Sequence, residues 1–133
     1  MTPPRLAALA LALAACGSAR PAPRPPKPPD PAQIAADLHA RMTEMAELAH
    51  RLRGACPELA RELRTLFGRM RISVDEANRA AEDPGLARQL TTELHKYDDS
   101  DRGLPDAIAG DLAACRDDAA VRDAMSTMPT LPP

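Results

Sequence analysis

Aromatic residues are almost absent from the chain, which has one Phe (Phe67), one Tyr (Tyr97) and no Trp among its 133 residues. Sugar-binding surfaces rely on aromatic platforms, so this class of function is not expected. Strand-forming β-branched and aromatic residues are scarce, and the apolar residues are mainly Leu, Ala, Met, Ile and Val. The composition therefore predicts an all-α fold with an aliphatic core.

Excess positive charge is also absent from most of the chain. Of 17 basic and 19 acidic residues, four basic and one acidic residue fall within residues 1–31. Residues 32–133 then hold 13 basic and 18 acidic side chains, a net charge of −5. Nucleic-acid backbones require a basic surface, so no nucleic-acid partner is expected.

No apolar run is long enough to cross a membrane, which takes about 20 residues. The run Leu6–Ala15 has ten residues, follows Arg5 and ends in small residues. These features are typical of a secretory signal peptide. We therefore assign residues 1–15 to a signal peptide.

The segment Leu13-Ala14-Ala15-Cys16 resembles the lipobox of bacterial lipoproteins, which has an aliphatic residue, two small residues and a cysteine. The resemblance covers residues 1–16 only. It implies cleavage before Cys16 and attachment of diacylglycerol to its thiol. The residue after the cysteine is Gly17 rather than the Asp that retains enteric lipoproteins in the inner membrane, which favours the outer membrane. The alternative is an ordinary signal peptide cut after Ala14.

A proline-rich spacer follows, and we assign residues 16–31 to the lipidated cysteine and this spacer. Seven of the twelve residues from Arg20 to Pro31 are proline. Such a sequence favours extended polyproline II, at about 3.1 Å per residue, and would hold a domain roughly 40 Å from a membrane. A proline-rich recognition ligand is the alternative.

Apolar residues then recur every three or four positions, which predicts amphipathic helices. Four are expected, over residues 31–53, 57–82, 84–97 and 105–125. Asp30-Pro31 with Gln33 predicts a capping box, and Asp98–Gly103 predicts a loop. A capping box beginning at Ser73 leaves open whether the second helix is continuous. We predict an antiparallel four-helix bundle over residues 32–125 and a flexible tail over 126–133.

Two cysteines, Cys56 and Cys115, lie within this domain. In an oxidising compartment they are expected to form a structural disulfide, since neither belongs to a C-x-x-C motif. Cys115 lies about 15 Å along a helix that starts at Pro105. That helix must therefore begin above the top of the second helix, or start later, near Asp111. Either way, the disulfide should join the last helix to the first interhelical turn.

No catalytic, metal or cofactor site is predicted. Glu47 and His50 have the Glu-x-x-His spacing of di-iron bundles, but no second pair exists and both should face solvent. His39 and His50 are about 16 Å apart along one helix, too far to share an ion. The chain lacks the C-x-x-C-H motif of c-type haem, and the last predicted helix has no histidine to ligate b-type haem. Asp98, Asp99 and Asp101 lack the spacing of an EF-hand loop.

These observations favour a non-enzymatic envelope lipoprotein, tethered to the membrane by its N-terminal lipid, with a structural or protein-interaction role. Its expected partners are the membrane and an envelope protein. The alternative is a bundle that binds a small ligand, haem or metal in the periplasm. Residues 32–133 carry no motif that identifies a family.

Overall fold

The computed structural model of the chain describes residues 21–131, and within that range the regular secondary structure is helical. The all-α fold class is therefore confirmed. The predicted lipobox and Cys16 lie outside the described residues. The elements are α1 (Pro31–Arg51), α2 (Cys56–Ala81), α3 (Pro84–His95), α4 (Asp98–Asp101), α5 (Leu104–Leu112), the 3₁₀ turn η1 (Ala113–Cys115) and α6 (Ala119–Ser126).

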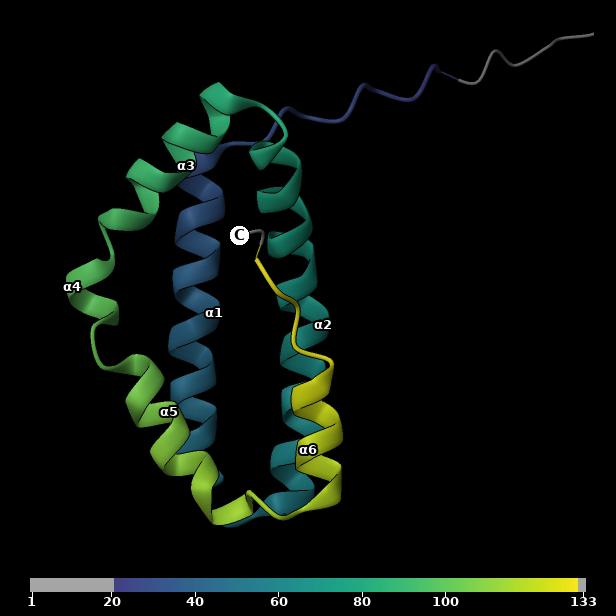
Figure 1. Cartoon of the computed structure of the whole chain (residues 1–133). Helices are drawn as coiled ribbons and strands as arrows, with labels where there is room; N and C mark the ends of the chain where they lie inside the picture. Colours follow the sequence, from purple (N-terminus) through teal and green to yellow (C-terminus); the bar gives the residue numbers. More distant parts are fainter. Residues whose placement is uncertain (1–20, 132–133) are drawn as a thin grey trace, which may run out of the picture.

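The two longest helices, α1 and α2, form an antiparallel hairpin, and α3, α5 and α6 pack on it (Figure 1). Helices α3 and α5 pack on α1, and α3 also contacts α2 near the end of the hairpin where the chain enters. Helix α6 packs on α2 and runs in the same direction as α2. The described part of the chain is thus a helical assembly on a long hairpin, and the regular four-helix bundle is not confirmed.

The predicted fourth helix over residues 105–125 is divided into α5, η1 and α6. Asp118 has an extended backbone, and its carboxylate accepts hydrogen bonds from the amides of Ala120 (2.9 Å) and Val121 (3.0 Å). An aspartate in this role begins a helix, so the chain starts a new one at Ala119. The periodicity of the apolar residues continues across the break, which is why the sequence pattern indicated one helix.

Aspartate caps start two other helices as predicted. Asp30 Oδ1 accepts from the amides of Ala32 (3.1 Å) and Gln33 (3.4 Å), and Pro31 follows it. Asp83 caps α3 in the same way, followed by Pro84. The second half of the predicted capping box is missing, because Gln33 Nε2 donates forward to Asp37 (2.8 Å) instead of back to the cap.

The second predicted helix is continuous and is not interrupted at Ser73. Helix α2 is one helix from Cys56 to Ala81, and Ser73 is buried within it instead of starting a new helix. The predicted loop Asp98–Gly103 contains the single helical turn α4, which ends before Gly103, whose φ is +131°. This positive φ is accessible to glycine at little cost.

The core lies along the hairpin and consists of aliphatic side chains around one aromatic ring. Phe67 is 1% exposed. The other large, fully buried side chains are Ile34, Leu59, Leu63, Leu66 and Cys115. These residues come from α1, α2 and η1, so the η1 turn is part of the core even though the helices on either side of it are short.

Candidate functional site

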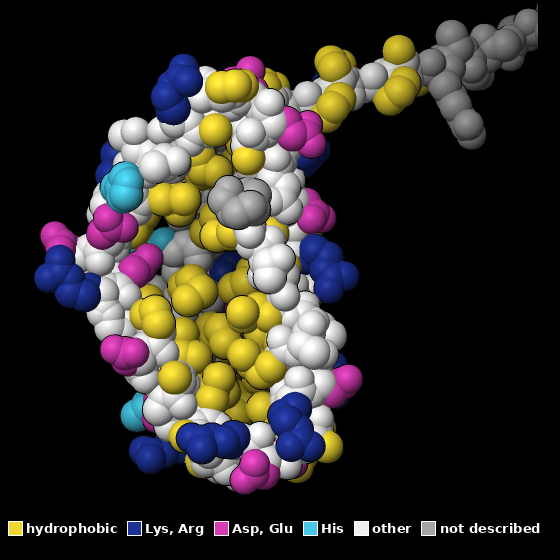
Figure 2. All heavy atoms as spheres, in the orientation of Figure 1, with side chains coloured by type: hydrophobic (Ala, Val, Ile, Leu, Met, Phe, Trp, Pro, Cys, Tyr) yellow, Lys and Arg dark blue, Asp and Glu magenta, His cyan; other side chains and the backbone are white. Residues whose placement is uncertain are grey.

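An apolar groove separates α5 from α6. The two helices lead away from the η1 turn on opposite sides of the hairpin, α5 over α1 and α6 over α2 (Figure 1). The groove between them has a volume of about 410 Å³. Its lining residues are Ala109, Leu112, Ala113, Cys115, Arg116, Val121, Arg122 and Met125. Figure 2 shows apolar side chains gathered along this face.

A second apolar hollow lies on the hairpin near the end of α6, with a volume of about 320 Å³. It is bordered by hairpin residues, namely Leu38, Met42, Met70 and Val74, and by the segment Met128–Leu131, which follows α6. Met128 is 40% exposed and Leu131 48% exposed, so this segment rests on the hairpin surface and does not enter the core. The tail predicted over 126–133 therefore lies against the hairpin as far as residue 131.

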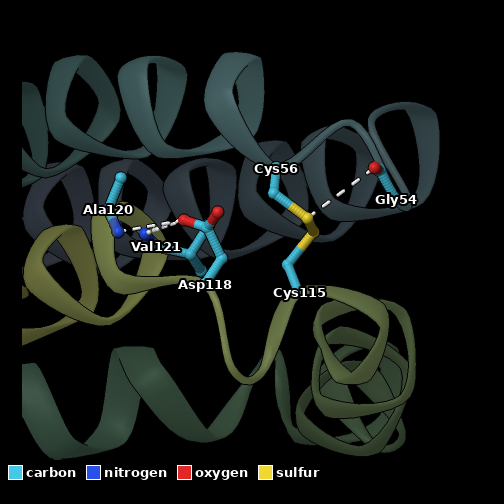
Figure 3. Close-up of a disulfide and its surroundings, with 6 residues drawn as sticks. All are labelled: Gly54, Cys56, Cys115, Asp118, Ala120 and Val121. Carbon is cyan, nitrogen blue, oxygen red and sulfur yellow. Dashed lines mark hydrogen bonds between the residues drawn. A yellow bond between two sulfur atoms is a disulfide. The ribbon is translucent and has the colours of Figure 1, made fainter.

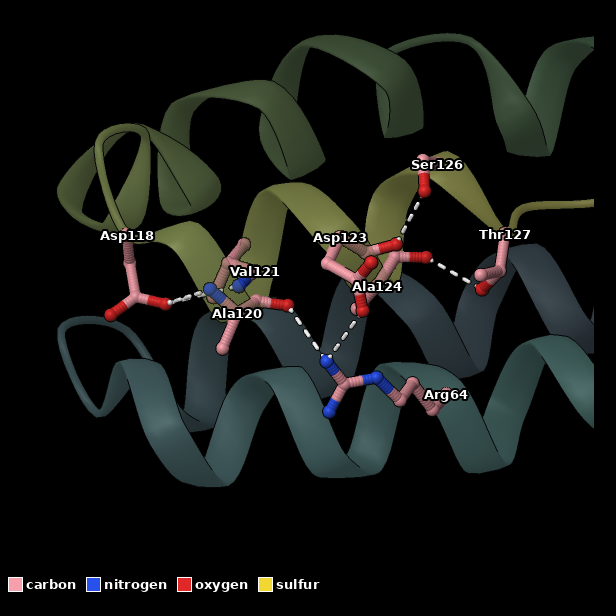
Figure 4. Close-up of polar contacts among 8 residues, drawn as sticks. All are labelled: Arg64, Asp118, Ala120, Val121, Asp123, Ala124, Ser126 and Thr127. Carbon is pink, nitrogen blue, oxygen red and sulfur yellow. Dashed lines mark hydrogen bonds and ion pairs between the residues drawn. The ribbon is translucent and has the colours of Figure 1, made fainter.

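Polar contacts hold α6 on α2 and make it a firm wall of the groove (Figure 4). The Arg64 guanidinium donates to Asp123 Oδ2 (2.9 Å) and to the Ala120 carbonyl (3.3 Å). Val121 and Ala124 are buried on the inner side of the helix. At the end of α6 the Thr127 hydroxyl donates to the Ala124 carbonyl (2.7 Å). Burial of Val121 and Ala124 and the contacts of Arg64 together place this helix of eight residues on α2.

The opposite wall, α5, is attached to α1 through Asp111. Its carboxylate lies 3.2 Å from His50 Nδ1 and 3.9 Å from an Arg53 guanidinium nitrogen. Ile108 of α5 is buried in the core. His50 is exposed, as the sequence predicts, and so is Glu47. The contact of His50 with Asp111 spans 61 residues of sequence, and no local pattern in the sequence predicts it.

A disulfide lies at the η1 turn, and one of its cysteines, Cys115, belongs to the groove lining (Figure 3). Cys56 and Cys115 are bonded, with their Cα atoms 5.5 Å apart, which is within the usual range for a disulfide. The predicted Cys56–Cys115 pairing is confirmed, and Cys56 starts α2 at the first interhelical turn, but Cys115 lies in the η1 turn after α5 instead of in the predicted last helix. A single helix from Pro105 would have placed Cys115 about 15 Å from its start, too far along to lie level with Cys56. Because α5 ends at Leu112 and Cys115 lies in the η1 turn, the two cysteines can meet.

Another histidine, His39, attaches the α3–α4 segment to α1. Its Nδ1 lies 2.6 Å from Asp101 Oδ1, and its ring stacks on Tyr97 with centroids 4.4 Å apart. His39 and Asp101 side chains are 28% and 33% exposed, so solvent screens the pair only in part. The ring stack and the polar contact together make His39 a positioning residue for α4.

We expect a double-mutant cycle of His39→Gln and Asp101→Asn to give a coupling free energy of about 0.5–1 kcal/mol in urea unfolding. The matched control is the pair His95–Asp98, whose side chains are 68% and 66% exposed and which lies within one turn. Its cycle, with His95→Gln and Asp98→Asn, should give a smaller coupling. Equal couplings would show that the His39 contact does not attach α4.

The residues considered as metal ligands do not come together. Among the residues that the structure describes, no three His, Cys, Asp or Glu side chains form a group that could hold a metal ion. The Asp98–Asp101 carboxylates instead pair with different partners: Asp98 with His95, Asp99 with Arg102 and Asp101 with His39. Between residues 21 and 131, no helix is both long and apolar enough to cross a membrane.

Comparisons with known proteins do not assign the chain to a family. No protein-family model, curated protein or solved structure matches the chain. The groove, with its two arginines, and the contacts of Arg64 and Asp111 are therefore the features on which a functional hypothesis can rest.

Proposed function

We propose that this chain is a lipid-anchored lipoprotein of the cell envelope that binds a protein partner in the groove between α5 and α6. The apolar groove is the observation that supports the binding role. Apolar surface exposed in a groove gains free energy when a partner covers it, at about 25 cal/mol per Å². Its lining consists of apolar side chains, the buried Cys115 and two arginines, which suit binding better than catalysis.

The anchor in this proposal rests on the lipobox sequence Leu13–Cys16. The spacer is compatible with it, because residues 21–30 have no regular secondary structure and extend away from the helices (Figure 1). They join the hairpin at the start of α1, whereas η1 lies at the opposite end of the hairpin. The length of α1, 21 residues, separates the two ends by about 30 Å. A partner could thus enter the groove on the side away from the anchor.

A polypeptide fits this groove better than a buried small ligand. The volume falls within the range of ligand pockets, which is about 300–1,000 Å³. Small-ligand pockets, however, cover most of their ligand, whereas this groove is open to solvent along the face seen in Figure 2. An occupant must therefore have a polar outer surface, as a segment of folded protein does.

We expect site-specific photocrosslinking in intact cells to detect the partner. Benzoylphenylalanine in place of Ala109, in the groove, should give one discrete crosslinked envelope protein. The same group in place of Ala40, exposed on α1 and outside the groove lining, is the matched control and should not give it. Adding Leu112→Gln should weaken the Ala109 crosslink, because it places a polar amide in the apolar lining. No crosslink from Ala109, or equal crosslinks from both positions, would contradict the proposal.

A further inference from the structure

We infer that the occupant of the groove is an amphipathic helix whose polar face carries acidic side chains where it passes the η1 turn. This inference rests on the proposed function and specifies the chemistry of the partner. The charged residues that line the groove, Arg116 and Arg122, are both positive, and no acidic residue lines it. Among the described residues, neither arginine forms an ion pair.

Asp106, near the start of α5, is exposed and does not line the groove, and the other acidic residues of the two groove walls contact residues outside it or cap a helix. Asp111 contacts His50 on α1 and Arg53 in the turn that follows α1. Asp118 caps α6, and Asp123 accepts from Arg64 on α2. Asp117 is exposed in the turn and does not line the groove. The charge on the groove lining itself is therefore positive, although residues 32–133 carry a net charge of −5.

The structure also favours a peptide over an acyl chain. The segment Met128–Leu131 already forms one side of the neighbouring apolar hollow, so a polypeptide segment packs its apolar side chains on this face. The open side of the groove would leave one flank of an acyl chain in water. An amphipathic helix buries apolar residues at positions i, i+3, i+4 and i+7 and keeps its polar face in solvent. Acidic residues beside that apolar stripe would then meet Arg116 and Arg122.

Two synthetic peptides test the inference with the purified full-length chain. Each has roughly 18 residues, long enough to form a helix, and the same leucine face. One has glutamate on its polar face and the other has lysine. We expect fluorescence anisotropy to show that the glutamate peptide binds about tenfold more tightly at low salt, a difference of about 1.4 kcal/mol. The net charge of residues 32–133 favours the opposite order, so this result would point to the groove arginines.

Charge reversal supplies the matched comparison. In the Arg116→Glu/Arg122→Glu variant the lysine peptide should bind more tightly than the glutamate peptide. The control variant Arg51→Glu/Arg71→Glu changes two exposed arginines outside the groove by the same total charge, and it should keep the original order. Circular dichroism would establish that both variants are folded.

Three results would overturn the inference: binding of neither peptide, equal or tighter binding of the lysine peptide to the native chain, or the same change in both charge-reversal variants. If the Ala109 crosslink in cells persists despite one of these results, only the acidic-helix chemistry is wrong. If the Ala109 crosslink is also absent, the proposed function fails with it.

Discussion

The Cys56→Ser/Cys115→Ser variant is expected to lose about 2–5 kcal/mol of unfolding free energy, the usual range for a disulfide in a small exported domain. The two cysteines are 59 residues apart, and closing a loop of this length restricts the unfolded chain by about 4 kcal/mol in the entropy model. Cys115 is also 1% exposed, so the substitution places a hydroxyl in the core. Both effects destabilise the folded chain relative to the unfolded chain.

Urea unfolding followed by circular dichroism measures this loss. The native sequence under reducing conditions is the control, because it breaks the covalent bond but keeps both sulfur atoms in place. The difference between reduced native chain and double serine variant then isolates the packing contribution at Cys115. Thiol titration of the denatured, unreduced protein checks the bond directly. Two titratable thiols in protein taken from the envelope would contradict the disulfide.

The parts of the fold that depend on neighbouring residues could be predicted from the sequence. Asp30-Pro31 and Asp83-Pro84 each place a cap and a proline at a helix start, and both helices begin there. A cap satisfies backbone amides within three residues, so its signal is local. Asp118 caps α6 in the same local way, but the apolar spacing continues across residues 105–125, so one long helix was predicted instead of a new helix start.

The contacts that place the helices around the groove join residues far apart in the sequence, so no local sequence pattern predicts them. His39–Asp101 and His50–Asp111 span 62 and 61 residues, and they depend on how the α3–α5 segment lies against α1. Arg64 and Asp123 meet only because α6 returns beside α2. Four equal helices would close a bundle, whereas α5 and α6 have nine and eight residues and leave the groove open. The groove therefore follows from the helix break that the periodicity did not reveal.

The Cys16→Ser variant is expected to abolish lipid attachment at residue 16, which is the largest change in behaviour predicted for any substitution. The lipobox resemblance implies that the Cys16 thiol receives the lipid, and serine lacks this thiol. Several acyl chains at about 0.8 kcal/mol per buried CH₂ give stable attachment, and their loss should leave an uncleaved precursor or a soluble exported protein. Fractionation and mass spectrometry of the mature N-terminus measure both outcomes, and Ser18→Ala, two residues away, should remain lipidated. An unmodified N-terminus at Ala15 in the native protein would mean that the ordinary signal-peptide alternative is right. The protein would then bind its partner without a lipid anchor.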